Sequence, residues 1–369
     1  MSKAAELAKI GEVTTSSQIG GRRNIIINGG MNVAQRATSA TGLGAQNNYF
    51  TLDRWKATIS SAGRFTMSQT ADGPVGFANC MKLDCTTADT SVAAGELLIM
   101  QHHLEGQDLQ AIGKGVTGAK EVTLSFYVKA NAAFDFVAEL QDQDNSRTNG
   151  RVFSTTTDWV RHIITYQADV DDGSSPFDDD NANSLSLNFW LHAGTTYSSG
   201  TLASSWENST SANRAAGIDS FFSNTDNNFF ITGVQLEVGS VATPFEHRSF
   251  GEELALCQRY FYRHTISYLS GYCPTTTRAD VALQFPCEMR IAPTAFTAVG
   301  TASHLSIQNE ATATACNNAP VVNLPDNVTS SGIRMIASVG SGLTVGNGVI
   351  LYNPDAATND YHVTFSSEL

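Results

Sequence analysis

The stretch that decides the fold is residues 185–192, LSLNFWLH. Its first, third, fifth and seventh positions are apolar, and the positions between them hold Ser186, Asn188, Trp190 and His192. Successive side chains of a strand point to opposite faces of its sheet, so this alternation predicts a half-buried strand. The same period recurs at 122–129 and 134–141, while 24–27, an asparagine followed by three isoleucines, is typical of a buried strand. These patterns predict an all-β protein.

The composition agrees with this prediction. Only 15% of the 369 residues are charged, and the net charge is −13. Ser, Thr, Asn and Gly take the place of charged residues, and this composition suits short strands and turns better than long helices. The acidic balance, with one short basic cluster at Arg22–Arg23, speaks against nucleic-acid binding. No apolar run is long enough to span a bilayer, so we expect no membrane insertion.

Turn residues and changes of the hydrophobic pattern divide the chain into four parts. Residues 1–20 form a short arm whose helix-forming start is too short to be stable alone, so it either orders on a partner or frays. Residues 21–248 fit one jelly-roll β-sandwich. A linker helix is expected over 249–264, followed by a second, smaller β-sandwich domain over 265–369.

The linker helix is the best local signal in the sequence. Ser249 and Glu252 have the spacing of a capping box, in which each side chain bonds the other residue's backbone amide. One apolar stripe follows at helical spacing: Phe250, Leu254, Cys257 and Phe261. The stripe needs burial, either against a neighbouring subunit or against the chain's own sandwich.

The non-core faces of the strands contain the candidate binding residues. Asn188, Trp190 and His192 share the outward parity of their strand, and an exposed indole there is costly unless something covers it. Three residues of other strands share this parity: Tyr127, Lys129 and Glu139. If these strands are neighbours, they form a polar face with aromatic rings, which suits a sugar. The alternative is that a loop, another subunit or the C-terminal domain covers the face.

Other constellations are weaker. The acidic run has oxygen ligands dense enough for a structural Ca²⁺, at Asp171, Asp172, Asp178 and Asp180, or else it is a solvated loop. No other cofactor is expected. No nucleophile, zinc-protease or nucleotide motif is present, so we expect no enzyme, although glycosidase carboxylates leave no local signature. The six cysteines show no paired spacing and are expected to be reduced, mostly buried thiols.

Several strings together are similar to those of one family. They are NIIINGGMNVAQR (24–36), YFTLDRW (49–55), LEGQDLQ (104–110), LSFYVKA (124–130), DDDNANSLSLNFWLHAG (178–194) and ITGVQLEVGSVATPFEHRSFGEELALCQRYF (231–261). Over residues 1–264 the chain resembles the structural tail-fibre family of marine cyanophages and related bacteriophages. FPCEMR at 285–290 is similar to a segment common in phage tail fibres and appendages. More distantly, Asn28-Gly-Gly and the Val-Gln-Leu-Glu that ends at Glu237 resemble the first and last strands of carbohydrate-binding jelly-rolls, where a structural Ca²⁺ often lies nearby.

The resemblance implies a function and partners. It implies a virion component, usually an oligomer and commonly a homotrimer, that docks on other proteins of the phage tail through its arm. Leu7 and Ile10 are the apolar residues expected to make that contact. The sandwich would then contact host-surface polysaccharide. The alternative is a capsid decoration protein or head fibre on the capsid surface.

Overall fold

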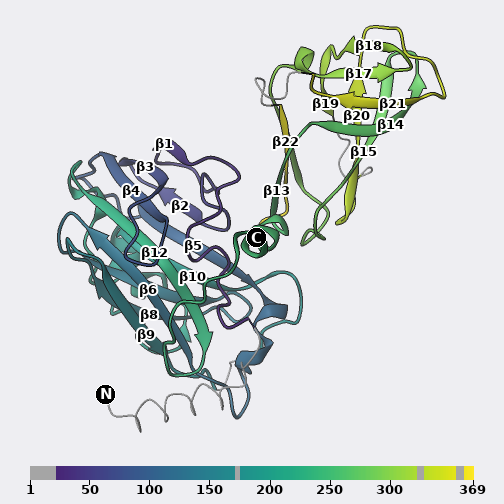
Figure 1. Cartoon of the computed structure of the whole chain (residues 1–369). Helices are drawn as coiled ribbons and strands as arrows, with labels where there is room; N and C mark the ends of the chain where they lie inside the picture. The colour runs from purple at the N-terminus through teal and green to yellow at the C-terminus, as the bar shows by residue number, and fades with distance from the viewer. Residues whose placement is uncertain (1–21, 171–174, 322–327, 355–360) are drawn as a thin grey trace. The chain divides into compact units, whose positions relative to one another are not determined.

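The computed structural model describes residues 22–170, 175–321, 328–354 and 361–369. The chain divides into two compact units, Met1–Phe250 with the terminal Leu369, and Gly251–Glu368. Figure 1 shows that both are built almost wholly of strands. The prediction of an all-β fold with one short linker helix is confirmed. The arm and its residues Leu7 and Ile10 lie outside the described residues.

The first unit is a sandwich of two six-stranded sheets in which all strand pairs are antiparallel. In order, sheet A contains β1 (Ser39–Leu43), β3 (Arg64–Thr70), β4 (Cys80–Thr87), β12 (Asn228–Val238), β6 (Val122–Ala130) and β9 (Val160–Tyr166). Sheet B contains β11 (Glu207–Asn208), β8 (Arg147–Ser154), β7 (Asp135–Asp142), β10 (Asn183–Ala193), β5 (Leu97–Glu105) and β2 (Lys56–Ser60). The connections contain α2 (Thr195–Ser198), η1 (Gly106–Asp108), η2 (Gln110–Ile112), η3 (Ser211–Asn213) and η4 (Phe221–Ser223).

The core between the sheets follows the predicted period. β10, β6 and β7 cover the three alternating stretches, and their apolar positions are buried in one cluster with side chains such as Phe126, Phe136 and Phe189. The rings of Phe126 and Phe189 meet edge to face at 5.1 Å between centroids. Burial of this apolar surface is the main force that holds the two sheets together.

Residues 24–27 are buried as predicted, but they form no strand. Side chains satisfy part of their backbone in place of a ladder. The Ile26 amide donates to Asn24 Oδ1 at 3.0 Å, and the Ile27 amide donates to His102 Nε2 at 3.2 Å. The strand prediction was wrong here because an apolar run reports burial and not the backbone partner.

The second unit begins with α3 (Phe250–Gln258) and contains two sheets. The three-stranded sheet has the order β13 (Phe261–Thr265), β22 (His362–Ser366) and β16 (Ala295–Val299). The seven-stranded sheet has the order β18 (Thr312–Ala315), β17 (Ser306–Asn309), β21 (Gly348–Tyr352), β14 (Tyr268–Thr275), β15 (Arg278–Gln284), β20 (Gly332–Ser338) and β19 (Asn318–Val321), and η5 spans Ala302–His304. Both sheets contribute to one core, which includes Val281, Met335 and Phe365.

The linker helix is shorter than predicted. α3 ends at Gln258, and Phe261 begins β13, where it pairs with Ser366 of β22. The stripe therefore stops after Cys257, which is fully buried, while Phe250 at the helix start is 62% exposed and Leu254 is half-buried. Sheet pairing with a strand about a hundred residues away overrides the local helical spacing. The boundary between the two compact units falls at the start of this helix, between Phe250 and Gly251.

Candidate functional site

The predicted glycan-binding residues lie on two different sheets. Tyr127 and Lys129 are on β6 in sheet A, whereas Glu139 is on β7 and the other three residues, Asn188, Trp190 and His192, are on β10 in sheet B. Five of the six have the predicted outward parity. At the sixth, a register shift between Trp190 and His192 pairs His192 with Leu98, a residue of the core, so the imidazole lies on the inner side of sheet B. The strands of the two groups belong to different sheets, so Tyr127 and Lys129 lie on one outer face of the sandwich, and Glu139, Asn188 and Trp190 lie on the other. The condition for one shared face, that these strands be neighbours, is not met.

On sheet B, Glu139 is the centre of a closed hydrogen-bond network. Its carboxylate accepts two bonds from Arg214, at 2.9 Å from Nε and 2.7 Å from Nη2. It also accepts bonds from Trp190 Nε1 at 2.9 Å, Asn188 Nδ2 at 2.9 Å and Thr148 Oγ1 at 2.5 Å. Burial raises the pKa of Glu139, but the bonds and charge of Arg214, helped by Thr148 and Trp190, outweigh it and leave the pKa below its usual value. Every lone pair is engaged within the protein.

The connection between β10 and β12 covers this face. Trp190 is fully buried: the Arg214 guanidinium lies 4.9 Å from its ring centroid, and the Tyr197 ring of α2 lies 5.3 Å away. His192 is also fully buried, with Nδ1 2.8 Å from Ser220 Oγ. Burial lowers the pKa of His192 to about 4, although the charge of Asp89 opposes this shift. The structure shows the predicted alternative, a loop over the face, and Trp190 cannot stack on a sugar in this arrangement.

The outer face of sheet A is different, because its aromatic side chains remain half-exposed. Phe77, from the connection between β3 and β4, contacts Tyr127 at 5.3 Å, Phe245 at 5.0 Å and His247 at 5.2 Å between ring centroids. Of these side chains, Phe77, Tyr127 and Phe245 are half-buried and His247 is exposed. We call the four residues Phe77, Tyr127, Phe245 and His247 the aromatic surface.

Charged groups border the aromatic surface. Lys129 Nζ lies 4.7 Å from the Phe230 ring centroid, 5.3 Å from that of Trp159 and 2.7 Å from Asp72 Oδ2. The Arg161 guanidinium lies 5.9 Å from the Tyr127 ring centroid. These groups place hydrogen-bond donors and an acceptor beside the rings, which is the chemistry that a sugar hydroxyl requires.

A glycine makes the close packing of this surface possible. Gly233 in β12 has a left-handed φ of 62°, at a register shift between Thr232 and Gln235 in the pairing with β6. A Cβ at this position would lie 2.7 Å from the Phe77 ring and 2.9 Å from Tyr127. The two rings therefore lie directly on the strand backbone.

Sequence reasoning missed Phe77, Phe245, His247 and Trp159. Phe77, Phe245 and His247 lie in connecting segments that have no alternation of apolar and polar residues. Strand parity therefore could not assign them to a face of the sandwich. The one available signal was the pair of aromatic residues in TPFEHR at 243–248, directly after the last predicted strand.

The predicted Ca²⁺ ligands are only partly described. Asp171 and Asp172 lie outside the described residues, while Asp178 and Asp180 are both exposed. Asp180 Oδ1 accepts a bond from the Ala182 amide at 2.8 Å. Asp169, at the start of the acidic run, is buried and accepts two bonds from Arg147, at 2.8 and 2.9 Å. A cation at the run stays a prediction.

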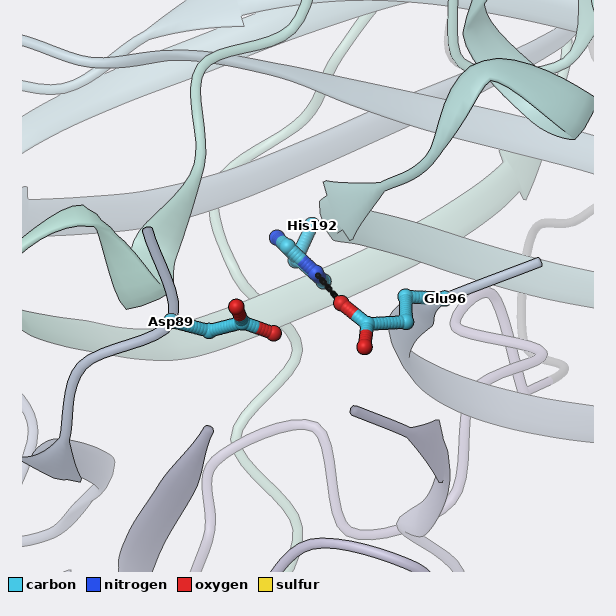
Figure 2. A group of neighbouring side chains, drawn as sticks. All are labelled: Asp89, Glu96 and His192. Carbon is cyan, nitrogen blue, oxygen red and sulfur yellow. Dashed lines mark ion pairs between the residues drawn. The ribbon is translucent and has the colours of Figure 1, made fainter. Parts of the chain in front are cut away.

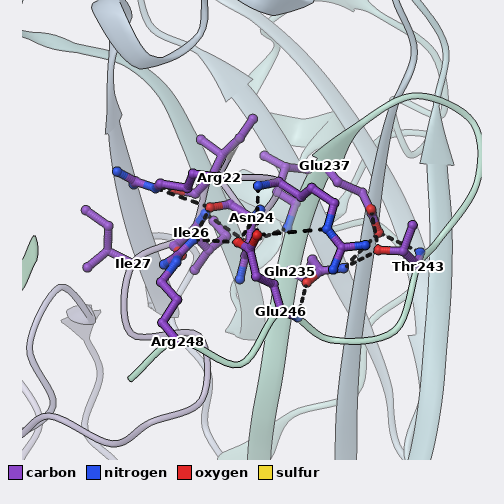
Figure 3. Close-up of polar contacts among 12 residues, drawn as sticks. Arg22, Asn24, Ile26, Ile27, Gln235, Glu237, Thr243, Glu246 and Arg248 are labelled. Atoms are coloured by element: carbon purple, nitrogen blue, oxygen red, sulfur yellow. Dashed lines mark hydrogen bonds and ion pairs between the residues drawn. The ribbon is translucent and has the colours of Figure 1, made fainter. Parts of the chain in front are cut away.

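The first and last segments of the first unit meet in a polar cluster, shown in Figure 3. Glu246 accepts the Arg23 amide at 3.0 Å and the Asn24 amide at 2.9 Å, and Arg248 Nη1 donates to Ile26 O at 3.2 Å. Beside it, Glu237 accepts the Thr243 amide at 2.8 Å and its hydroxyl at 2.7 Å. Protein donors thus engage these carboxylates, and the cluster fastens the two ends of the sandwich.

Asn28 is engaged in the same way. Its side chain donates to Val33 O at 2.8 Å and Asp53 O at 2.9 Å, and accepts the Val33 amide at 2.9 Å. The Asn28 and Glu237 positions singled out by the jelly-roll resemblance therefore serve hydrogen bonding within the sandwich.

Two further predictions concern the whole chain. Five of the six cysteines are buried, Cys287 is half-buried, and none forms a disulfide. Within the described ranges, no helix has the length and apolar character needed to cross a membrane.

Comparison with known proteins finds relatives by structure only. No family model and no curated protein matches the sequence. Similar solved structures include "CBM4 structure and function" (13% identity, 57% of this chain and 97% of that chain, TM-score 0.29) and the CBM22-1 xylan-binding domain of Paenibacillus barcinonensis Xyn10C (12%, 57% and 97%, TM-score 0.27). TmCBM61 in complex with β-1,4-galactotriose is a third (9%, 59% and 99%, TM-score 0.30). These neighbours are carbohydrate-binding modules with β-sandwich folds. Function must be argued from this chain's own side chains, because likeness at these scores carries no functional argument.

Proposed function

We propose that the protein is a non-enzymatic structural component of a bacteriophage virion, a tail fibre or tail appendage, and that its first unit binds host-surface glycan. The virion role is supported by the sequence resemblance over residues 1–264. The glycan role is supported by the aromatic surface of sheet A, which is the observation that carries it. Of the six residues that the sequence proposed, Tyr127 and Lys129 are the two that this surface keeps within reach of a ligand.

The chemistry of the aromatic surface fits a sugar. The C–H face of a pyranose stacks on an aromatic ring, and its hydroxyls bond nearby charged and polar groups. Tyr127 offers a ring with a phenol, Lys129 and Arg161 offer donors, and Asp72 offers an acceptor. The rings are braced by one another and by the backbone at Gly233, so little conformational entropy is lost when a ligand binds.

The test is binding of the full chain to a glycan array and to host envelope polysaccharide. Tyr127→Ala should weaken binding about tenfold or more, which corresponds to about 1.4 kcal/mol. Tyr268→Ala is the matched control, because Tyr268 is 72% exposed in the second unit and stacks on another tyrosine. A wild-type chain that binds no glycan, or an unchanged affinity in Tyr127→Ala, would contradict the proposal.

Assembly is the second part of the proposal. The resemblance supports a homotrimer that docks on the tail through residues 1–20, and the exposed Phe250 is an apolar group that a neighbouring subunit can cover. Sedimentation of the full chain at micromolar concentration should give a trimer, and a clean monomer would contradict this. Cryo-EM of the intact particle should place the protein on the tail. Density on capsid hexamers or vertices would instead support a decoration protein.

A further inference from the structure

One buried cluster at the end of the first unit takes no part in the proposed glycan binding. Asp89 lies in the connection after β4, Glu96 directly precedes β5, and His192 is near the end of β10. One ligand atom from each of the three side chains lies within 4.8 Å of the other two. Figure 2 shows the imidazole and both carboxylates turned toward one another.

The central atoms of the cluster have no hydrogen-bond partner. His192 is fully buried, and its Nε2 makes no hydrogen bond; neither does Glu96 Oε2, which lies 3.5 Å away. Nδ1 of the same ring lies 2.8 Å from Ser220 Oγ. When Nδ1 donates its proton there, Nε2 presents a lone pair to the two carboxylates. A buried lone pair facing a carboxylate oxygen is repulsive unless a proton or a cation lies between them.

Outer groups hold Asp89 and His192 in this orientation. Asp89 accepts the Ser91 amide at 3.1 Å and the Ser61 hydroxyl at 3.1 Å, and its own amide donates to Phe222 O at 2.8 Å. The Phe222 ring packs edge-on against His192 at 5.2 Å between centroids. Such support of the outer atoms of an imidazole and a carboxylate is characteristic of ligands in metal sites.

We propose that Asp89, Glu96 and His192 form a binding site for a divalent transition-metal ion of the zinc class. An imidazole nitrogen with two carboxylate oxygens suits Zn²⁺, whereas Ca²⁺ takes oxygen ligands throughout. Ligands about 2.1 Å from zinc in a tetrahedron lie about 3.4 Å apart. The 3.5 Å between His192 Nε2 and Glu96 Oε2 matches this edge. The Asp89 oxygen lies within 4.8 Å of both atoms, so it would approach them by about 1.4 Å at most when an ion binds.

The ion would join one connection of the sandwich to a strand that is distant in the sequence. It would bind the segment between β4 and β5 to the end of β10, close to the point where the Gly194 amide donates to Glu96 O at 2.8 Å. Since the ligands come from segments about a hundred residues apart, occupation of the site should stabilise the first unit as a whole.

The experiment uses the full chain, stripped with EDTA, loaded with Zn²⁺ alone and dialysed. Wild type should retain one zinc ion per chain, measured by mass spectrometry. Its melting temperature, followed by tryptophan fluorescence, should be higher with zinc than without it. Glu96→Gln keeps the size of the side chain and removes its charge. It should fold, bind zinc at least tenfold more weakly and melt equally with and without the ion. The matched control is Asp158→Asn, which removes an exposed carboxylate of the same unit and should behave as wild type.

Three results would overturn the proposal. Wild type that retains no zinc would show that a proton shared between the acids fills the cluster. Equal zinc binding by Glu96→Gln would place the ion elsewhere, on the thiols for example. In a parallel loading with equal concentrations of Zn²⁺ and Ca²⁺, retention of Ca²⁺ in preference to Zn²⁺ would refute the assigned metal class.

Discussion

Arg214→Met tests whether the network on sheet B is the structural contact that its geometry indicates. Arg214 gives Glu139 two charged hydrogen bonds and lies over Trp190, and its side chain is 14% exposed while that of Glu139 is completely buried. Methionine keeps most of the apolar stem against the indole and removes the guanidinium. Glu139 then keeps its bonds from neutral donors but loses the cation that compensates its burial.

The expected loss of stability can be calculated from proton uptake. A buried carboxylate without its cation can become neutral by binding a proton. The free energy lost at a given pH therefore cannot exceed the free energy of protonating that carboxylate at that pH. With an unfolded-state pKa of about 4.3 and about 1.36 kcal/mol per pH unit, the ceiling is about 4 kcal/mol at pH 7 and about 1 kcal/mol at pH 5. The first value agrees with about 3–5 kcal/mol for breaking a buried ion pair.

The sign of the pH dependence differs between the two proteins. In wild type the pKa of Glu139 is lowered, so its stabilising contribution is present above about pH 4.3 and is lost as the pH falls through the folded-state value. In Arg214→Met we expect this pKa to be raised, so stability falls as the pH rises from about 4.3 toward the new folded-state value. The deficit of the variant should therefore grow between pH 5 and pH 7.

Urea unfolding followed by tryptophan fluorescence measures this deficit. All four tryptophans, Trp55, Trp159, Trp190 and Trp206, belong to the first unit, so the signal reports that unit alone. The double variant Glu139→Gln with Arg214→Met has no buried charge and should show no extra pH dependence. A deficit below about 1 kcal/mol at pH 7, or one that is equal at pH 5 and pH 7, would refute the role assigned to Arg214.

Three further predictions follow from burial and backbone geometry. Trp190→Ala should lower the stability of the first unit by about 3–5 kcal/mol in the same urea assay, because it removes a fully buried ring; a loss of glycan binding without a loss of stability would contradict this. Gly233→Ala should cost about 1–2 kcal/mol for the left-handed φ and should also weaken glycan binding, since its Cβ displaces the Phe77 ring; unchanged stability and affinity would show that the strand bends freely. At pH 8 the half-buried Cys287 should react with a thiol reagent long before the other five thiols, which are buried; burial raises the pKa of Cys287 too, but it raises that of Cys80, Cys85 and Cys316 to about 11, and rapid labelling of several thiols in the folded protein would contradict this.

The alternation of apolar and polar residues along the strands was enough to predict which side chains form the core, as β10 illustrates. Leu187 and Phe189 are buried between the sheets as their alternation requires, because a shift of one residue would expose all four apolar side chains at once. Period also assigned Trp190 correctly to the outer side of its strand. It could not show that a residue 24 positions later, Arg214, would cover the ring, because the intervening segment has no period of its own.

The helix α3 also shows that a local pattern does not report contacts that are distant in the sequence. The capping box places its start correctly, because a cap acts within one turn. The end depended on β22, whose Ser366 pairs with Phe261, and no local pattern reports a partner so distant in the chain. The cluster of Asp89, Glu96 and His192 was missed for this reason as well, because about a hundred residues separate His192 from the segment that contains the two acids.

The two outer faces of the sandwich carry similar side chains, so residue type cannot decide which face binds. What separates them is the length of chain available to cover each. Residues 194–227 lie between β10 and β12 and fold over sheet B, where Arg214 and Tyr197 seal the indole of Trp190. The connection at residues 71–79 and the segment between β12 and α3 lie on the outer side of sheet A, and they contribute rings of their own, Phe77 and Phe245, rather than a cover. A ligand therefore meets preassembled rings on sheet A, whereas on sheet B it would first have to break the bonds around a buried carboxylate.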